Sequence, residues 1–181
     1  SSPVQTISQG TNWKLVSAGG YFMSAIKTDG TLWSWGHNSN GELGNGSSLP
    51  AVNGISSPVQ TVAGGTNWKS VRTGTYIASA IKTDGTLWGW GRNDYGQVGD
   101  NTAVAKSSPV LVSAGRWVAL SINGDLNRYA MRSDGTIWAW GYNDEGQLGQ
   151  NNRINRSSPV QVGTDTNWSI ATPPWGTSST I

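Results

Sequence analysis

The chain has 181 residues and a formal net charge of +2, and only 12% of its residues are charged. This length suits one domain of ordinary size. Its Lys and Arg residues are scattered rather than gathered in the basic stripe of a nucleic-acid binder, so no nucleic-acid partner is expected. The chain has no cysteine, which excludes disulfides, thiolate catalysis and cysteine metal sites.

The remaining composition favours an all-β protein. Hydrophobic residues make up 35% of the chain, and they include 11 Trp, while Gly reaches 25 residues. Such a mixture is typical of many short strands joined by tight turns around an aromatic core. No apolar run approaches the length of a membrane span. The chain begins Ser-Ser-Pro, without an initiator Met or a signal-like segment, and we expect a processed product or part of a longer chain.

Repeats organise the whole sequence. The opening Ser-Ser-Pro-Val motif returns at 56, 107 and 157, which predicts repeats at 1–55, 56–106 and 107–156 and a partial fourth repeat at 157–181. The first repeat carries a short insertion around residues 49–54. A period near fifty residues is typical of propeller blades.

Each repeat reads as about four short strands. In the first, strands are expected near 13–16 and 21–27, followed by an Asp29-Gly30 hairpin and a return strand over 31–36. Trp33 and Trp35 are two residues apart and should point to the same side of that strand. The Pro-Val segment then closes the unit as a fourth strand, where a missing N–H donor is tolerated.

A compact loop follows the return strand in every repeat. Two glycines flank one apolar residue in the segments 38–44, 93–99 and 143–149, and we expect that apolar residue to point inward. Since no stretch shows helical periodicity, the sequence predicts an all-β propeller of four-stranded antiparallel blades, with about three blades and part of a fourth.

These loops carry a family resemblance. The segment 140–149 reads Trp-Gly-Tyr-Asn-Asp-Glu-Gly-Gln-Leu-Gly, and with its copies at 35–44 and 90–99 it resembles the regulator of chromosome condensation repeat family. The resemblance implies a propeller, usually of seven blades, so this chain would be a portion of a ring. The ring would be closed by the rest of a longer chain or by other copies. The Asn-Trp-Lys and Asp-Gly-Thr-Leu-Trp motifs of the repeats are similar to those of bacterial and phage-carried members.

Catalytic chemistry is not indicated. His37 is the only histidine, and without a second His or a cysteine it makes a poor metal ligand or triad member. Asp29, Asp84 and Asp134 recur, but turn geometry explains them. We therefore expect no enzyme activity, no catalytic or metal-binding residue and no cofactor.

Residues that differ between the repeats are the better binding candidates, because the scaffold does not require them. Recurrence assigns ten of the tryptophans to the core and leaves only Trp175 without a counterpart. The positions after each Trp-Gly pair vary, and so do the loops beside them, where binding residues tend to lie. The candidates are His37, Arg92, Tyr142, Tyr95, Glu145 and Arg153.

The sequence thus favours a non-enzymatic structural or interaction module. We expect it in a phage virion appendage or a bacterial surface protein, at an extracellular, cell-surface or virion location, binding a protein or a glycan through its variable loops. Two alternatives follow from the resemblance: a guanine-nucleotide exchange factor, or a propeller that inhibits an enzyme.

Overall fold

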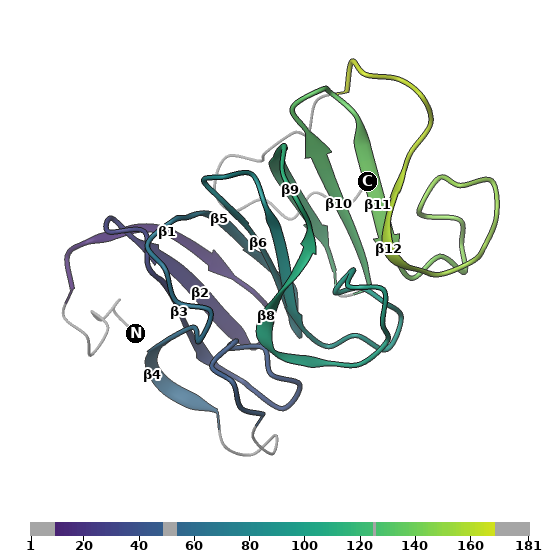
Figure 1. Ribbon diagram of the computed structural model, residues 1–181. Coiled ribbons are helices and arrows are strands. Elements are labelled where there is room, and N and C mark those ends of the chain that lie inside the picture. Colours follow the sequence, from purple (N-terminus) through teal and green to yellow (C-terminus); the bar gives the residue numbers. More distant parts are fainter. Residues whose placement is uncertain (1–9, 49–53, 125, 169–181) are drawn as a thin grey trace, which may run out of the picture.

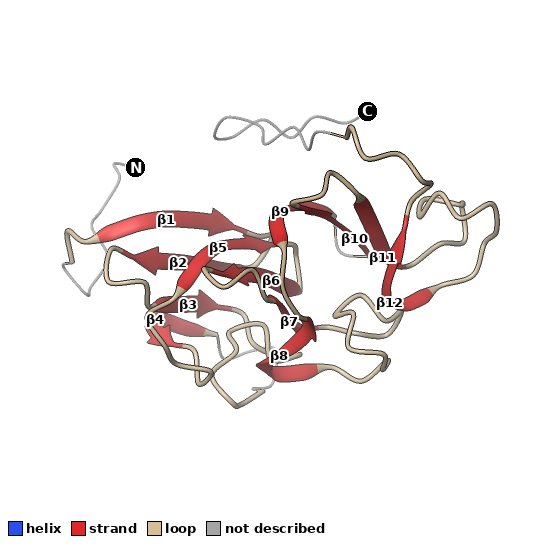
Figure 2. Cartoon of the chain, turned by 45° about the horizontal axis from the view of Figure 1, so that its top comes forward, coloured by secondary structure: helices blue, strands red, loops and turns tan. Residues whose placement is uncertain are grey.

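The computed structural model describes residues 10–48, 54–124 and 126–168. Their regular structure consists of twelve strands in three four-stranded antiparallel sheets, which stand side by side like the blades of a propeller (Figures 1 and 2). Blade 1 has the order β1-β2-β3-β4, and blades 2 and 3 repeat it with β5–β8 and β9–β12. The fold class predicted from the sequence is therefore confirmed.

The strands have these bounds. Blade 1 contains β1 (Trp13–Ala18), β2 (Phe22–Lys27), β3 (Leu32–Gly36) and β4 (Ile55–Gln60). Blade 2 contains β5 (Trp68–Thr73), β6 (Ile77–Lys82), β7 (Leu87–Gly91) and β8 (Lys106–Ser113). Blade 3 contains β9 (Trp117–Asn123), β10 (Asn127–Arg132), β11 (Ile137–Gly141) and β12 (Arg156–Gln161).

Every Ser-Ser-Pro-Val motif in the described residues belongs to the last strand of a blade, as predicted. In β3, Trp33 pairs with Ala25 and Trp35 with Met23, so both indoles lie on the same side of blade 1.

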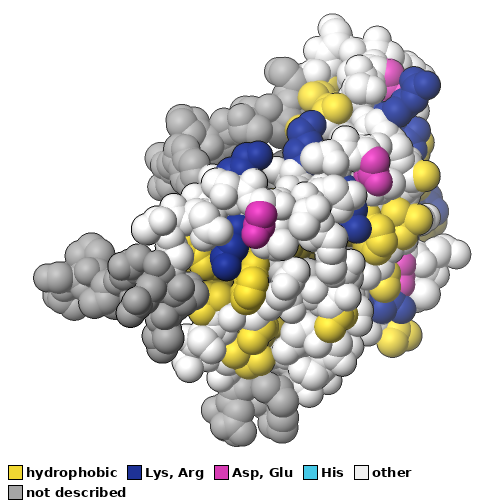
Figure 3. Space-filling model, turned by 60° about the vertical axis from the view of Figure 1, so that its left-hand side comes forward, with side chains coloured by type: hydrophobic (Ala, Val, Ile, Leu, Met, Phe, Trp, Pro, Cys, Tyr) yellow, Lys and Arg dark blue, Asp and Glu magenta, His cyan; other side chains and the backbone are white. Residues whose placement is uncertain are grey.

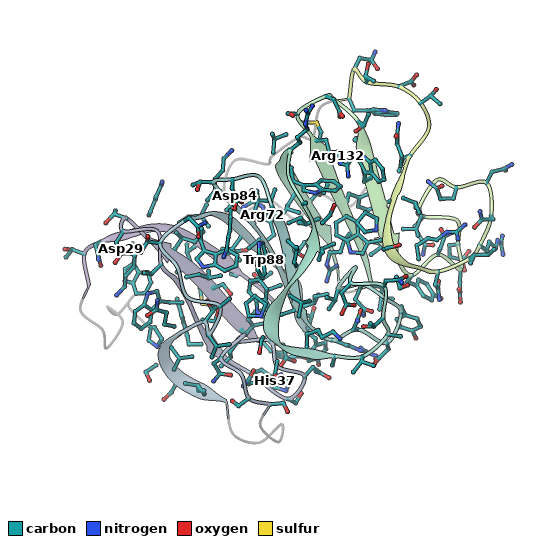
Figure 4. All side chains as sticks on the ribbon, viewed as in Figure 1. Asp29, His37, Arg72, Asp84, Trp88 and Arg132 are labelled. Carbon is teal, nitrogen blue, oxygen red and sulfur yellow. The ribbon has the colours of Figure 1, made fainter. Side chains whose placement is uncertain are left out.

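The two ends of the blades differ in construction. One end carries the three Asp-Gly hairpins between the second and third strands, and we call it the turn face. At the other end the long loops leave β3, β7 and β11, and we call it the loop face. Figure 4 shows Asp29 at the left-hand end of blade 1 and Asp84 on the upper side of blade 2, whereas His37 lies at the lower edge.

Blades pack through an apolar layer that matches the repeat pattern. Phe22, Ile26 and Leu32 of blade 1 form one cluster with Trp68 and Trp90 of blade 2. A second cluster joins Ile81 and Leu87 of blade 2 to three residues of blade 3: Trp117, Leu120 and Trp140. All ten of these side chains are nearly or fully inaccessible, so each blade buries one face of the next.

A hydrogen bond accompanies each of these interfaces. The Trp90 indole N–H donates to the backbone carbonyl of Glu42, at 2.8 Å, and the Trp140 indole donates to the carbonyl of Gln97, at 3.0 Å. Both acceptors lie in the compact loop of the preceding blade. The apolar residue of that loop is fully buried in all three copies, as predicted: Leu43, Val98 and Leu148.

The other tryptophans of the repeats are only partly buried, so the prediction that ten tryptophans belong to the core holds only in part. Trp88 is half-buried, and together with Trp68 it encloses the Lys82 ammonium, which lies 4.3 and 4.5 Å from the two ring centroids. Lys27 and Arg132 occupy the same place in blades 1 and 3. Trp168 is 44% exposed.

Two of the scattered cations, Arg128 and Arg132, are not simply solvated surface side chains. The Arg128 side chain is fully buried, and it donates to the carbonyls of Gly124 and Asn127. Arg132 lies between two indole rings. Two backbone carbonyls therefore hold the first cation and two aromatic rings hold the second, roles that the sequence spacing did not reveal.

Two features singled out in the sequence lie outside the described residues. They are most of the insertion around residues 49–54 and the segment after Trp168, which contains Trp175.

Candidate functional site

The residue after each Trp-Gly pair occupies one equivalent place on the loop face. The backbone N–H of His37 donates to the carbonyl of Tyr21, at 3.0 Å, and that of Arg92 donates to the carbonyl of Tyr76, at 2.9 Å. In blade 3 the N–H of Tyr142 donates to Leu126, at 2.8 Å. The backbone is thus the same three times, and only the side chain changes.

Blades 1 and 2 bring three aromatic rings together on this face. The ring centroids of Tyr21 and Tyr76 are 5.4 Å apart, and the His37 ring lies 6.1 Å from the first and 5.5 Å from the second. These separations are those of mutually attractive aromatic pairs. Tyr21 is 61% exposed, so the cluster presents an aromatic surface to solvent.

A hollow of about 380 Å³ opens beside this cluster. Its lining joins His37 and Arg92, two of the residues predicted from the sequence, to four others: Ser39, Asn40, Tyr76 and Asp94. The Arg92 Nε donates to Asp94 Oδ2 at 2.6 Å, which holds the guanidinium at the rim. The hollow therefore offers hydroxyl, amide, guanidinium and carboxylate groups against an aromatic wall.

A buried carboxylate positions His37. Glu42 is inaccessible to solvent, and its Oε1 lies 3.1 Å from the His37 Nδ1. It also accepts the backbone N–H and the side-chain amide of Asn40, at 2.9 and 2.8 Å. In blades 2 and 3 a glutamine takes this place and accepts only the equivalent backbone N–H. The pairing of His37 with Glu42 therefore belongs to the first blade alone.

A second aromatic contact joins blades 2 and 3. The rings of Tyr95 and Tyr142 lie 4.9 Å apart in an edge-to-face arrangement. A hydrogen bond with the Asp144 carboxylate raises the pKa of the Tyr142 hydroxyl above its usual value, and the nearby charge of Glu145 adds to the effect. The predicted residues Tyr142, Tyr95 and Glu145 are thus neighbours.

Arg153, the sixth predicted residue, is separate from both clusters. It lies exposed on the β11–β12 loop, and it makes no ion pair or hydrogen bond with the part of the chain that the structure describes. Conversely, sequence reasoning missed Tyr21 and Tyr76 as site residues. A signal was present, because both directly precede the second strand of their repeats, at a position where blade 3 has Leu126.

The outer part of the β7–β8 loop is held by an ion pair. Lys106 lies 2.9 Å from Asp100, whose carboxylate also accepts the Thr102 N–H and hydroxyl. Burial raises the pKa of Asp100, but the bonds from Lys106 and Thr102 outweigh it and hold that pKa below its usual value. The Asp100 carboxylate therefore serves to hold the conformation of this loop.

Within residues 10–48, 54–124 and 126–168, no group of three or more His, Asp or Glu side chains is arranged to hold a metal ion. Nor do these residues include a helix with the length and apolar character of a membrane span. Figure 3 turns the side of blade 1 toward the viewer, and its Lys and Arg side chains are dispersed among uncharged and acidic groups.

Comparison with known proteins supports the reading of the repeats. A family model described as the regulator of chromosome condensation (RCC1) repeat matches residues 29–81, 84–121 and 134–171, which is more than half of the chain. A second model with the same description matches residues 13–42 and 68–97.

Curated relatives match over about half of this chain. The RCC1 domain-containing protein RUG3, mitochondrial, of Arabidopsis thaliana is 33% identical over 55% of this chain. The probable E3 ubiquitin-protein ligase HERC6 of Homo sapiens is 35% identical, also over 55% of this chain. The matched part spans only 22% of the first relative and 10% of the second.

Solved structures share the fold. The crystal structure of Prp20p from Saccharomyces cerevisiae, described with its binding properties to Gsp1p and histones, matches with a TM-score of 0.76. The match covers 84% of this chain and 39% of that one at 19% identity, which supports the fold alone. Human WBSCR16 matches with a TM-score of 0.68 and 26% identity, over 82% of this chain and 37% of that one.

These findings correct two expectations. The predicted extracellular, cell-surface or virion location is wrong, because the relatives are RCC1-type proteins such as the plant protein named as mitochondrial. A bacterial or phage origin, and with it a role in a virion appendage, has no support, since these relatives come from a plant, human and yeast. Amino-acid composition and the residue types of the repeat motifs carry no signal for cellular compartment, which is why the predicted location was wrong.

Proposed function

We propose, from the premise that the chain belongs to the regulator of chromosome condensation (RCC1) repeat family, that its blades form a non-catalytic module that binds a partner protein through the loop face. The observation that carries the proposal is the gathering of non-equivalent side chains at backbone-equivalent positions. His37, Arg92 and Tyr142 follow the same turn in three blades, yet they differ in charge, size and hydrogen bonding.

The chemistry of the loop face suits a protein surface. Tyr and Arg are the side chains that contribute most to protein interfaces, because they combine large contact area with few rotatable bonds and directed polar groups. Tyr21, Tyr76, Tyr95 and Tyr142 lie here, and an ion pair with Asp94 holds the Arg92 guanidinium. A rigid sheet supports each of these residues, so little conformational entropy is lost on binding.

The structural relatives supply candidate partners. Prp20p was studied for binding to Gsp1p and histones, and a structure of yeast RCC1 (Prp20) was solved bound to Kap60. Those partners are properties of Prp20p, and we use them as probes for this chain.

The test measures binding of the 181-residue chain to purified Gsp1p, histones and Kap60 by calorimetry. Arg92→Ala and Tyr142→Ala should each weaken the interaction about tenfold or more, as truncation of an interface anchor does. The matched control is Lys69→Ala, an exposed residue at the start of β5 near the turn face, which should leave affinity unchanged. The proposal fails if none of the three binds, or if the control weakens binding as much as the loop-face variants.

Guanine-nucleotide exchange is the second candidate, favoured by the likeness in fold to Prp20p. It requires a loop that dislodges a bound nucleotide. Release of a fluorescent nucleotide from small GTPases would measure it. Acceleration by the chain that is lost in Arg92→Ala would establish exchange, and an unchanged release rate would leave simple binding.

A further inference from the structure

His37 uses both of its ring nitrogens within its own loop. Its Nδ1 lies 3.1 Å from the Oε1 atom of Glu42, and its Nε2 lies 3.2 Å from the Oγ atom of Ser39. Glu42 is inaccessible to solvent, whereas His37 and Ser39 are partly exposed and line the hollow on the loop face. A carboxylate, an imidazole and a hydroxyl therefore follow one another in the order found in serine hydrolases.

The carboxylate decides which nitrogen of His37 carries the proton. An ionised carboxylate only accepts hydrogen bonds, so the neutral ring donates from Nδ1 to Glu42. The Nε2 atom is then an acceptor, and the Ser39 hydroxyl must donate the hydrogen bond between them. The Asn40 side-chain amide donates to the Ser39 Oγ, at 3.2 Å, and occupies a lone pair of that oxygen. The network thus directs the serine proton at a base.

The other two blades show that the fold does not require this arrangement. In both, a glutamine takes the place of Glu42 and accepts the backbone N–H two residues before it, as Glu42 accepts that of Asn40. A neutral amide is therefore enough to close the loop. The position of Ser39 is taken by Asp94 in blade 2 and by Asp144 in blade 3, and neither copy has a histidine. Among the three loops, only that of blade 1 combines the three groups.

We propose that Ser39 is a nucleophilic acceptor of acyl groups, at which a small activated ester modifies the chain. The Ser39 Oγ attacks the ester carbonyl carbon while its proton passes to the Nε2 atom of His37. The bond from that carbon to the leaving oxygen breaks, the alkoxide or phenolate departs with the electron pair, and an acyl-serine remains. The hollow of about 380 Å³ that Ser39 and His37 line can hold such an ester.

Glu42 is a positioning residue in this step, since it does not touch the ester. It holds the His37 ring in the tautomer whose Nε2 can accept the serine proton. A single acyl transfer to the chain itself is a modification rather than a turnover. The inference therefore goes beyond the proposed binding function and does not depend on it.

The test treats the 181-residue chain with p-nitrophenyl acetate and locates the acetyl groups by peptide mass spectrometry. Ser39 should be acetylated at least about tenfold faster in the unmodified chain than in His37→Ala or Glu42→Gln. Lys69, which is exposed near the turn face, reacts without help from His37 and should be acetylated equally in all three chains. Lys69 is thus an internal control for the reagent, and circular dichroism checks that each variant is folded.

Blade 2 offers a matched control. Asp94 has the loop position of Ser39, but an arginine stands in place of the histidine and a glutamine in place of the glutamate. Asp94→Ser in a Ser39→Ala chain therefore places a hydroxyl in the same loop geometry without the base. That hydroxyl should be acetylated at least about tenfold more slowly than Ser39 of the unmodified chain.

The role of Glu42 has a readout that does not involve the ester. Because His37 is the only histidine, the ring nitrogens of a ¹⁵N-labelled chain give unambiguous signals that show where the proton lies. At mildly alkaline pH we expect it on Nδ1. In Glu42→Gln the amide oxygen should accept the Asn40 N–H, as Gln97 accepts its equivalent, so the amide nitrogen faces the ring. The proton should then move to Nε2, which can no longer accept from the serine.

Three results would overturn the proposal. The first is a Ser39 that is acetylated no faster than the serine of the Asp94→Ser control while Lys69 reacts normally. The second is an unchanged rate at Ser39 in folded His37→Ala, which would show that the ring is not the base. The third is a Glu42→Gln chain in which the position of the ring proton and the rate at Ser39 both stay the same, which would reduce Glu42 to a loop contact.

Discussion

The turn face and the loop face of the blades are built from the same repeats, yet one is uniform and the other varied. On the turn face Asp29, Asp84 and Asp134 each accept the N–H and the hydroxyl of the threonine two residues later. That threonine oxygen accepts the next indole N–H in turn, as Thr86 does from Trp88. The network is the same in all three blades.

On the loop face equivalent backbone positions carry His37, Arg92 and Tyr142, and each makes different side-chain contacts. The difference teaches that recurrence marks what the fold requires. A residue repeated three times closes a hairpin or packs between blades, so a distinctive repeat motif is a poor guide to a binding site. Positions where the copies disagree are released from that requirement and are available for recognition.

The largest effect should come from the interface tryptophans. Trp90→Ala removes a fully buried indole and leaves the Glu42 carbonyl without its donor. We expect the free energy of unfolding to fall by about 3–5 kcal/mol. Trp35→Ala, at the equivalent place in blade 1, where no described blade packs on the indole, should cost clearly less in this chain. Urea denaturation of both variants measures the difference, and equal losses would contradict the inference that Trp35 is less tightly packed than Trp90.

A pair of glycines sharpens the same comparison between closed and open interfaces. Gly41 and Gly146 both have positive φ, 83° and 79°, so alanine is strained at either site by about 1–2 kcal/mol. Only at Gly41 does the added Cβ collide with the Ser107 backbone of the next blade. Gly41→Ala should therefore cost about 1–3 kcal/mol more than Gly146→Ala. Thermal unfolding of the two variants tests this, and matching midpoints would refute it.

Much of this fold could be predicted because each strand, turn and core pattern occurs in three repeats of the sequence. The Asp-Gly hairpins, the shared side of Trp33 and Trp35 and the buried Leu43 all follow from local pattern and period. The burial of Arg128 could not be predicted, since its guanidinium is held by the backbone carbonyls of Gly124 and Asn127, and such bonds leave no signature in the residue types of its strand.

The site was predictable only in part. Disagreement between copies selected His37, Arg92, Tyr95 and Tyr142, which the structure places on the loop face, but it could not say which of them would meet across a blade boundary. Tyr21 and Tyr76 were overlooked because they agree with each other in two repeats. Both tyrosines lie in the turn ahead of β2 and β6. The presence of tyrosine at the same position of two repeats does not reveal that this turn brings them to the loop face.

A smaller effect, with a definite dependence on pH, is expected on the turn face. Hydrogen bonds from the Thr86 N–H and hydroxyl lower the pKa of Asp84 below its ordinary value of 3.8. Because the folded pKa is the lower one, the charged carboxylate stabilises the fold above about pH 3.8, and this contribution disappears as the pH falls through the folded pKa.

Asp84→Ala should consequently lower the unfolding midpoint at pH 6 and have little effect well below pH 3.8. Asp84→Asn is the matched control, since its amide oxygen can still accept both threonine bonds without a charge. Thermal scans across this pH range provide the measurement. A deficit of Asp84→Ala that stays constant into strong acid would show that the carboxylate charge is not involved.

The smallest effect on stability should come from the loop face. Variants there test whether its side chains are free of a structural role, unlike those of the turn face. Arg92 is partly exposed, and its ion pair with Asp94 joins two solvent-accessible side chains. Such pairs contribute little in water, so Arg92→Ala should change the free energy of unfolding by no more than about 0.5 kcal/mol. The same variant should weaken partner binding strongly if the loop face is the interface. A large loss of stability would instead make Arg92 part of the scaffold, and its variation among the blades would then reflect local packing between blades 1 and 2 rather than recognition.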